Sequence, residues 1–301
     1  MALDINIARI EDFIDRHYRR QASFGGGVPS FASIEFSINA MCNRRCIFCP
    51  RVDPDAFPNL DSHLSIDAYR KVIDDVAAVD FSGRISFSGF CEPLLTRNLE
   101  DYIAYARTQC PQITIEIVSN GDHVNLARLK SLFAAGLNNI RISLYDGPHQ
   151  DDKFLQMQRE SGLSDKEFIL RKRYLSPEEQ YGLTINNRAG AVHLVNDKIQ
   201  VKALDKAMAQ PCHYPFYKML VDYDGSVFIC SNDWLKKRVV GNIKDETIFA
   251  IWSGDRFNIA RRRLGCSNRE FAPCNKCDVN GLYNGKTHFD AWMNFYAAKE
   301  S

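Results

Sequence analysis

Short apolar stretches alternate with amphipathic segments through the first part of the chain. Five stretches have the composition of buried strands: residues 32–38, 84–88, 113–118, 139–144 and 167–174. Three segments between them repeat apolar residues at helical spacing: residues 66–79, 98–108 and 125–135. Because strands that alternate with helices form parallel βα units, the pattern predicts a barrel or open barrel with a site at the carboxyl ends of its strands.

The pattern changes near residues 186–190. Residues 218–230 alternate apolar and polar positions around Asp224-Gly225, which predicts a hairpin with a two-residue turn. Helical segments follow at residues 247–252, at 256–264 and from about 288 onwards. We expect the arginine run at 261–263 to form a solvated helix face. The change of pattern predicts two closely packed units, residues 1–195 and 196–301.

Charge and hydropathy exclude several classes of partner. Lys and Arg together number 38 and Asp and Glu 37, so no excess of positive charge indicates a nucleic-acid or anionic-membrane partner. No apolar run approaches the roughly 20 residues of a membrane span. The N-terminal segment predicts an amphipathic helix with Ile7, Ile10, Phe13 and Ile14 on one face, not a signal peptide. We therefore expect a cytoplasmic protein.

The chain has ten cysteines, and structural disulfides are rare in a reducing cytoplasm. Seven fall into two groups, as metal ligands do in cytoplasmic proteins. The first group is Cys42, Cys46 and Cys49, spaced C-x3-C-x2-C directly after the first strand. Three thiolates on one loop can bind three irons of a [4Fe–4S] cluster and leave the fourth iron open to a ligand. Zinc is the alternative, but zinc sites usually complete four ligands, and no fourth Cys or His lies nearby.

An aromatic residue, Phe48, precedes the third cysteine, and the loop resembles the signature of the radical S-adenosylmethionine superfamily. The resemblance implies an α/β fold with a partial (β/α)6 TIM-like barrel. It also implies that the open iron binds the amino and carboxylate groups of S-adenosylmethionine, with Phe48 beside the adenine. One-electron reduction of the cofactor would then yield a 5′-deoxyadenosyl radical that abstracts a hydrogen atom from the substrate. An external donor such as flavodoxin or ferredoxin would supply the electron.

Further matches to the superfamily follow successive strands. Residues 88–93 (Ser-Gly-Phe-Cys-Glu-Pro) resemble its Gly-Gly-Glu-Pro type motif, with Cys91 where glycine is commoner. Residues 119–121 (Ser-Asn-Gly) resemble its polar-Asn-Gly turn. Each segment would also suit an ordinary turn at a strand end. The resemblance gives these candidates for S-adenosylmethionine binding: Phe48, Gly89, Glu92, Ser119, Asn120 and, on the fourth strand, Ser143.

The second group, Cys212, Cys230, Cys274 and Cys277, supplies four thiolates. On spacing alone, such a site suits zinc and an iron–sulfur cluster about equally. The order of the hairpin, a Gly-Asn-Ile turn at 241–243, Ile-Trp at 251–252 and the C-x2-C pair is similar to the auxiliary-cluster domain called SPASM. The full SPASM pattern has more cysteines after that pair, and this chain has none, so it resembles the shortened form, twitch. The resemblance implies a hairpin-plus-helix domain with one auxiliary [4Fe–4S] cluster.

The two resemblances cover nearly the whole chain and imply a radical enzyme that dehydrogenates or epimerises a small polar substrate, such as a sugar, an aminocyclitol or a polyol. In a dehydrogenase the auxiliary cluster would accept an electron, whereas in an epimerase a thiol would return a hydrogen atom. Two alternatives stay open. One is a maturase that modifies a ribosomal peptide, and the other is a non-catalytic zinc or electron-transfer protein.

Further residues are candidates for the chemistry itself. Cys91 and Cys266 belong to neither cysteine group and are candidate hydrogen donors, with simple packing as the alternative. Asp233 follows the second group's hairpin and is a candidate proton acceptor, with a turn as the alternative. Arg188 and Tyr145 are candidates to contact the substrate. The alternative for Arg188 is a solvated loop arginine.

Overall fold

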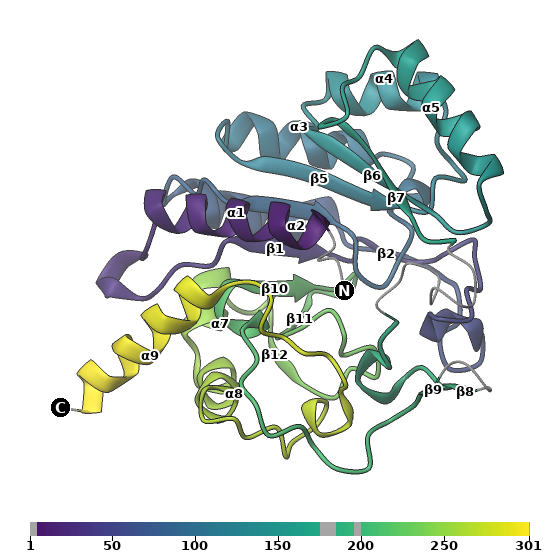
Figure 1. Ribbon diagram of the computed structural model, residues 1–301. Helices are drawn as coiled ribbons and strands as arrows, with labels where there is room; N and C mark the ends of the chain where they lie inside the picture. The colour runs from purple at the N-terminus through teal and green to yellow at the C-terminus, as the bar shows by residue number, and fades with distance from the viewer. Residues whose placement is uncertain (1–4, 175–184, 196–199, 301) are drawn as a thin grey trace.

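Eight strands form one mixed sheet in the computed structural model, which describes residues 5–174, 185–195 and 200–300. The strands are β1 (Ser33–Phe36), β4 (Arg84–Phe87), β5 (Thr114–Ser119), β6 (Asn139–Leu144), β7 (Phe168–Lys172), β10 (Lys218–Val221), β11 (Ser226–Phe228) and β12 (Val239–Asn242). Their order across the sheet is β12-β11-β10-β1-β4-β5-β6-β7 (Figure 1). In the part of this order that runs from β10 through β1 to β7, each strand is parallel to its neighbours. The pairs β10–β11 and β11–β12 are antiparallel. Two further sheets pair β2 (Asn39–Ala40) with β3 (Leu60–His63) and β8 (Leu194–Val195) with β9 (Gln200–Val201).

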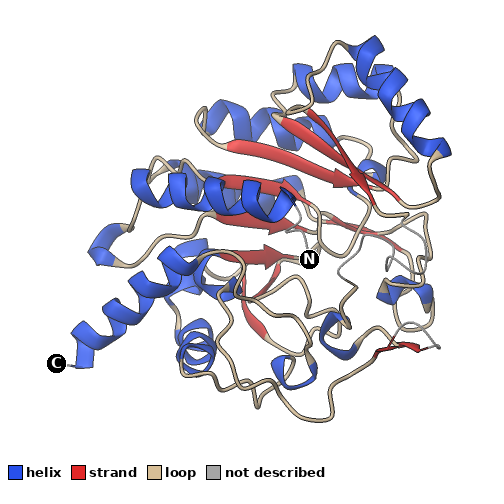
Figure 2. Cartoon of the chain, viewed as in Figure 1, coloured by secondary structure: helices blue, strands red, loops and turns tan. Residues whose placement is uncertain are grey.

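Helices follow the first four parallel strands of the barrel in turn. They are α2 (Ile66–Ala77), α3 (Leu99–Gln109), α4 (Leu126–Ala134) and α5 (His149–Ser161). Figure 2 shows the strands in the middle of the molecule with helices outside them. The α/β fold with a parallel sheet is therefore confirmed. The sequence pattern missed α5, because this helix is strongly polar and buries only Gln150 and Phe154.

The remaining α-helices among the described residues lie in the N-terminal segment and in the C-terminal third of the chain. They are α1 (Ile5–Arg20), α6 (Tyr214–Tyr217), α7 (Ile248–Ser253), α8 (Asp255–Gly265) and α9 (Lys286–Glu300). In Figure 1, α7 and α8 lie below β10, and the end of α9 extends away from the body of the molecule. No helix in the described part of the chain is long and apolar enough to cross a membrane.

The two faces of the parallel strands differ in polarity, and this difference creates the site. Successive side chains on a strand point to opposite faces. Ile34 of β1 and Ile85 of β4 are fully buried in the main hydrophobic core. Their neighbours Glu35 and Arg84 line a cavity instead. The sheet therefore has an apolar face in the core and a polar face that encloses a cavity.

The sixth parallel strand of the sheet is β10, which belongs to the C-terminal hairpin rather than to a sixth βα repeat. It pairs with β1 from Ser33 opposite Lys218 to Phe36 opposite Val221. The two units predicted from the sequence therefore share one sheet. The boundary between residues 195 and 196 stays a prediction.

The hairpin between β10 and β11 is confirmed, but its turn has three residues rather than two. The Gly225 amide donates to the carbonyl of Asp222 at 2.9 Å, and the Asp222 amide donates to the carbonyl of Ser226 at 2.9 Å. Gly225 has a φ of +87°, which glycine adopts without strain. The loop is therefore a turn followed by a glycine bulge, a common three-residue hairpin connection.

The prediction of a solvated face at 261–263 is wrong for Arg261. Its side chain is fully buried, and its guanidinium carbon lies 3.8 Å from the ring centre of Trp252 and 3.9 Å from that of Trp292. Burial lowers the pKa of Arg261 to about 9. Consecutive residues of a helix point in directions about 100° apart, so a run of three arginines cannot share one face.

Two buried histidines join α1 to α9. His17 and His288 are stacked, with their ring centres 6.0 Å apart, and neither side chain is more than 2% exposed. His17 also contacts Phe81 edge to face. Burial lowers the pKa of His17 from 6.5 to about 4 and that of His288 from 6.5 to about 3. Both rings are therefore neutral in the folded protein near neutral pH.

These histidines should make the folded state sensitive to mild acid. Between pH 6.5 and about 4, the unfolded state binds more protons than the folded state. The contribution of these histidines to the free energy of unfolding is therefore fully present above pH 6.5 and is lost as the pH falls through this window. We expect each histidine to contribute a loss of about 2 kcal/mol between pH 7.5 and pH 5. Thermal unfolding across this range measures the effect. His288→Phe should reduce the slope and the exposed-site control His63→Gln should not; equal slopes in both variants would contradict the assignment.

Candidate active site

The loop that carries Cys42, Cys46 and Cys49 lies at the carboxyl ends of the parallel strands. The three cysteines line a cavity of about 240 Å³, here called the cysteine-loop cavity. Glu92, which lies five residues past β4, and Asn120, which directly follows β5, line the same cavity. The structure therefore brings together the three cysteines and the strand-end motifs that the sequence singles out.

The environment of these thiols fits ligands of an iron–sulfur cluster. Burial raises the pKa of all three, and that of Cys46 reaches about 12. Hydrogen bonds from the backbone act against this effect: the N–H of Arg44 lowers the pKa of Cys42, and the N–H of Arg51 lowers the pKa of Cys49. Thiols buried in this way ionise at neutral pH when a metal cation is beside them. Three such thiols on one loop match a cluster that keeps one open iron.

An arginine of the cysteine loop ties the loop to two strand ends. Arg44 forms bidentate contacts with Asp122 (2.5 Å), which follows β5, and with Asp146 (2.7 Å), which follows β6. Asn43 also donates to Asp122, at 2.6 Å. The two carboxylates hold the pKa of Arg44 above its usual range. This clamp was not predicted from the sequence, although an aspartate one to three residues past a strand end is a signal that could have indicated it.

Glu92 joins the ends of β4 and β5. Its side chain is 3% exposed, and one carboxylate oxygen accepts from the Leu94 amide (3.1 Å) and the Ser119 hydroxyl (2.8 Å). The other oxygen accepts from the Asn120 amide at 2.8 Å. Burial raises the pKa of Glu92, whereas the hydrogen bonds from these donors lower it. A buried carboxylate in this position is suited to a ligand that carries a cationic amino group.

The other proposed cofactor residues also line the cysteine-loop cavity. Phe48 and Tyr145 form its aromatic side, with ring centres 5.1 Å apart, and Ser143 lies nearby on β6. Gly89 has a φ of +86°, and a Cβ atom there would come within 2.8 Å of Leu220. Cys91 lines the cavity too, but its thiol donates to the carbonyl of Ser88 at 3.6 Å.

A second cavity, of about 270 Å³, continues from the first into the interior of the barrel. The two share Ser88, Gly89, Val118, Arg171, Arg188 and Trp234. The walls of this barrel cavity carry charged side chains of the strands: Glu35, Arg84, Glu116, Arg141, Arg171 and Lys218. None of these six residues was predicted from the sequence as part of the site. Charged residues at alternate positions of otherwise apolar strands are the signal that could have found them.

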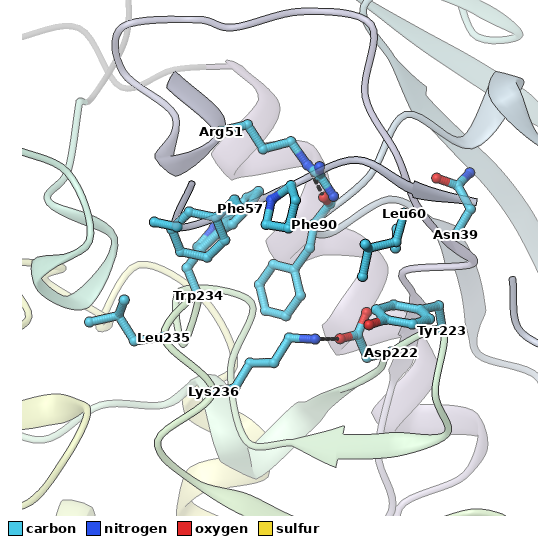
Figure 3. A pocket seen from close by; sticks show the side chains of 13 residues that line it. Asn39, Arg51, Phe57, Leu60, Phe90, Asp222, Tyr223, Trp234, Leu235 and Lys236 are labelled. Atoms are coloured by element: carbon cyan, nitrogen blue, oxygen red, sulfur yellow. Dashed lines mark hydrogen bonds and ion pairs between the residues drawn. The ribbon is translucent and has the colours of Figure 1, made fainter. Parts of the chain in front are cut away.

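Trp234 separates these cavities from an outer pocket of about 260 Å³ between the cysteine loop and the hairpin (Figure 3). The indole packs against Phe90 and Phe57, with ring centres 4.7 Å and 5.5 Å away. Arg51 fixes this wall by donating to the Phe90 carbonyl at 2.7 Å. Trp234 lines the outer pocket and both inner cavities, and Arg51 and Phe90 line the outer pocket and the cysteine-loop cavity, so these three residues form the partition.

All four cysteines of the second group, Cys212, Cys230, Cys274 and Cys277, line one small space of about 30 Å³ in the C-terminal part of the chain. Among the described residues, no three His, Cys, Asp or Glu side chains are arranged to hold a single metal ion. Four thiols around one space supply the full set of protein ligands that a [4Fe–4S] cluster needs. Gly281 keeps this space open, since a Cβ atom there would lie 2.5 Å from the Cys212 sulfur.

A short chain of hydrogen bonds links the barrel cavity to this auxiliary site. Asn232 donates to the Cys230 sulfur from its backbone at 3.3 Å and from its side chain at 3.4 Å. The same side chain accepts from Arg188 at 3.2 Å. Tyr214 lines both the barrel cavity and the auxiliary space. The two spaces are therefore separated by single side chains.

Asn187 holds Arg188 at the junction of the cavities. Asn187 is fully buried, and its side chain donates to the carbonyls of Lys202 (2.8 Å) and Lys276 (2.7 Å). Its backbone amide donates to the Asp278 carboxylate at 2.9 Å. Arg188 has a φ of +48°, a conformation that costs a non-glycine residue energy and often marks functional sites. The loop of Cys274 and Cys277 therefore fixes the position of Arg188.

Two candidates from the sequence lie away from the barrel cavities. Asp233 is fully buried, and its carboxylate accepts from the amides of Lys237 (2.9 Å) and Arg238 (2.8 Å), so it stabilises a turn beside the auxiliary space. Cys266 is exposed at the end of α8 and is not among the residues that line the cavities described above.

Family models match both parts of the chain. Residues 36–168 match the radical SAM superfamily, and residues 212–278 match SPASM, an iron–sulfur cluster-binding domain. The first match contains Cys42, Cys46 and Cys49, and the second contains the four cysteines that line the auxiliary space.

Known proteins with related sequences and structures agree with these matches. The S-adenosyl-L-methionine-dependent 2-deoxy-scyllo-inosamine dehydrogenase of Niallia circulans is 28% identical over 249 residues, which cover 82% of this chain and 93% of that protein. The crystal structure of BtrN in complex with AdoMet and 2-DOIA matches with a TM-score of 0.70 and 25% identity, over 85% of this chain and 96% of that one. The fold is also similar to that of anSMEcpe with bound AdoMet, with a TM-score of 0.53 and 13% identity over 89% of this chain and 93% of that one.

The matches distinguish the main interpretation from its alternatives. A radical SAM domain with all three loop cysteines supports an enzyme rather than a zinc-binding or purely electron-carrying protein. The cofactors are S-adenosylmethionine with its [4Fe–4S] cluster and an iron–sulfur cluster of the SPASM domain. Residues 36–168 therefore form a radical S-adenosylmethionine domain and residues 212–278 a SPASM iron–sulfur domain, which together make the chain a radical SAM enzyme.

Proposed function

We propose that this enzyme is a dehydrogenase that oxidises a secondary alcohol of a small sugar, cyclitol or polyol. The observation that carries the proposal is the barrel cavity, which opens into the cysteine-loop cavity at Arg188 and reaches the auxiliary site at Tyr214. At about 270 Å³, the cavity suits one sugar-sized molecule better than a peptide. The Niallia circulans relative, a dehydrogenase of 2-deoxy-scyllo-inosamine by name, supports the same class of reaction.

Oxidation of a secondary alcohol removes one hydrogen atom from the carbinol carbon, then one proton and one electron, and leaves a ketone. When bound, S-adenosylmethionine and its cluster supply the radical that takes the hydrogen atom, and the auxiliary cluster supplies the acceptor of the electron. The protein must therefore hold the alcohol between the two sites and keep bulk water away from it.

Residues at the junction of the cavities are suited to these tasks. We propose that Arg188 binds a hydroxyl near the reacting carbon, because it lines both cavities and contacts Asn232 beside the auxiliary site. Tyr145 lines only the cysteine-loop cavity of the two, so its contact would be with the part of the substrate nearest the cofactor. Trp234 separates both cavities from the outer pocket and would exclude water.

The cofactor sites follow from the cavity walls. We propose that S-adenosylmethionine is held by Phe48, Gly89, Glu92, Ser119, Asn120 and Ser143, which all line the cysteine-loop cavity. Cys42, Cys46 and Cys49 would bind its cluster, and Cys212, Cys230, Cys274 and Cys277 would bind the auxiliary cluster. A flavodoxin or ferredoxin in a reducing cytoplasm would supply the first electron.

The two spare cysteine candidates favour dehydrogenation over epimerisation. An epimerase needs a thiol that faces the substrate radical and returns a hydrogen atom to it. The Cys91 thiol donates to the Ser88 carbonyl in the cavity wall, and Cys266 is exposed at the surface. Asp233 is engaged with two backbone amides and is left out of the proposed mechanism.

Turnover in heavy water tests the proposal. The reconstituted holoenzyme is reduced with dithionite under anaerobic conditions and given a panel of sugars and cyclitols. We expect a ketone and 5′-deoxyadenosine in equal amounts, with no solvent deuterium on the carbon that reacts. Deuterium fixed on the carbinol carbon of an unoxidised product would identify an epimerase and contradict the proposal.

A further inference from the structure

We propose that Asn59 is a positioning residue for the first cluster, and that it holds Cys42 in the orientation in which S-adenosylmethionine can bind the open iron. The inference rests on the proposed function only where that function places the cofactor in the cysteine-loop cavity. Asn59 is exposed and is not among the described residues that line this cavity. It would therefore act through the backbone of the cysteine loop and not by contact with the cofactor.

The side chain of Asn59 binds both backbone groups of Cys42. The Cys42 amide donates to Asn59 Oδ1 at 2.9 Å, and Asn59 Nδ2 donates to the Cys42 carbonyl at 3.0 Å. A side-chain amide offers the same kinds of donor and acceptor as a peptide group. Two residues that exchange both hydrogen bonds in this way resemble a hydrogen-bonded pair of antiparallel strands. The contact therefore fixes the rotation of the Cys42 backbone as well as its position.

The local sequence explains why a side chain takes this place. β2 pairs with β3 as far as Ala40 opposite Leu60, with an irregular register at this end. Asn59 directly precedes β3, and Pro58 before it has no N–H with which to continue the pairing. The hydrogen bonds of this small sheet therefore continue into the cysteine loop through the Asn59 side chain.

Arg51 connects this contact to the other end of the loop. It follows Cys49 by two residues, and its Nη1 donates to Asn59 Oδ1 at 3.1 Å. Its Nε donates to the Phe90 carbonyl at 2.7 Å, and its backbone N–H donates to the Cys49 thiol. The first and the last cysteine of the loop are therefore tied to each other through Asn59 and Arg51.

The Cys42 segment is also tied to Glu92, the proposed partner of the cofactor's amino group. The carbonyl of Met41 accepts from the Glu92 amide at 2.8 Å. The Asn39 side chain donates to the Glu92 carbonyl at 3.0 Å and accepts from the Met41 amide at 2.8 Å. One ligand must meet the open iron and the Glu92 carboxylate together, so their relative position sets its affinity. A rotation of Cys42 would change that position.

Binding of S-adenosylmethionine to the Asn59→Ala protein tests the inference. Calorimetric titration of the reconstituted, anaerobic protein without reductant measures the dissociation constant. We expect about eight irons per chain, as in the unaltered protein, and a dissociation constant about 10-fold higher or more. Electron paramagnetic resonance of samples frozen directly after reduction should show a weaker effect of the cofactor on the cluster. A residue that only stabilised the fold would change neither the affinity nor this spectrum in cluster-loaded protein.

Two further variants make the test specific. Asn59→Asp keeps the acceptor for the Cys42 amide and for Arg51 but loses the donor to the Cys42 carbonyl, so we expect a dissociation constant about 3-fold higher. It also decides the test if the alanine variant does not take up its first cluster. Gln156→Ala removes an exposed amide on α5 that donates to Glu160 at 2.7 Å, and it should bind the cofactor as the unaltered protein does.

The outcomes separate this inference from the proposed function. The inference is overturned if the cluster-loaded variants of Asn59 bind S-adenosylmethionine as tightly as the unaltered protein. It is overturned as well if neither variant can be loaded, because Asn59 would then serve assembly of the cluster alone. Ketone formation by the unaltered protein would leave the proposed dehydrogenase in place in both cases. An unaltered protein that bound no S-adenosylmethionine would contradict the proposed function itself, before any variant is compared.

Discussion

C46A protein is expected to form 5′-deoxyadenosine at less than about one-hundredth of the rate of the unaltered enzyme. Cys42, Cys46 and Cys49 are the thiols that line the cysteine-loop cavity, apart from Cys91 in the wall. With two ligands left, the loop cannot hold a [4Fe–4S] cluster that presents its open iron to S-adenosylmethionine. Reduction with dithionite followed by chromatography measures the nucleoside, and the iron content should fall from about eight to about four per chain.

Cys110→Ala is the matched control. Cys110 is also a buried cysteine, but its thiol contacts the Ile73 carbonyl in the helical layer, at 3.8 Å, away from both cysteine groups. This variant should keep about eight irons and the full rate of nucleoside formation. A C46A protein that retained all its iron and cleaved S-adenosylmethionine normally would remove the cysteine loop from the proposed machinery.

Features set by neighbouring residues could be predicted from the sequence. The strand predicted at 139–144 is β6, and the helix predicted from residue 66 is α2, whose first turn is capped by the side chain of Ser65. Both depend on apolar periodicity and on capping, which are local. The first cysteine group and the pair Cys274 and Cys277 can be recognised for the same reason, because each lies within one short loop.

Features that depend on distant partners could not be predicted. Arg44 contacts Asp122 and Asp146, which follow it by 78 and 102 residues in the sequence. Arg261 is buried only because Trp252 and Trp292 pack around it. The charged barrel cavity has the same origin. Nothing near Glu116 in the sequence indicates its role, because its ion-pair partner, Arg141 at 2.6 Å, comes from the next strand. Side chains from separate strands converge only after the sheet has formed.

Loss of the auxiliary cluster should separate cleavage of S-adenosylmethionine from oxidation of the substrate. We expect Cys230→Ala to retain about four irons and to keep forming 5′-deoxyadenosine, while the yield of ketone falls about 100-fold or more. Among the residues that the structure describes, none lines both the auxiliary space and the cysteine-loop cavity, so removing a thiol from one leaves the other intact. Iron analysis, nucleoside formation and ketone formation are measured on one preparation.

Asn232→Ala is the companion variant, because it keeps all four thiols and removes one of the two donors to the Cys230 sulfur. The backbone donor at 3.3 Å stays and the side-chain donor at 3.4 Å is lost. We expect about eight irons and an auxiliary cluster whose reduction potential is lower, since hydrogen bonds to cluster sulfurs raise the potential. Ketone formation at the normal rate by the Cys230→Ala protein would mean that the substrate's electron does not leave through the auxiliary site.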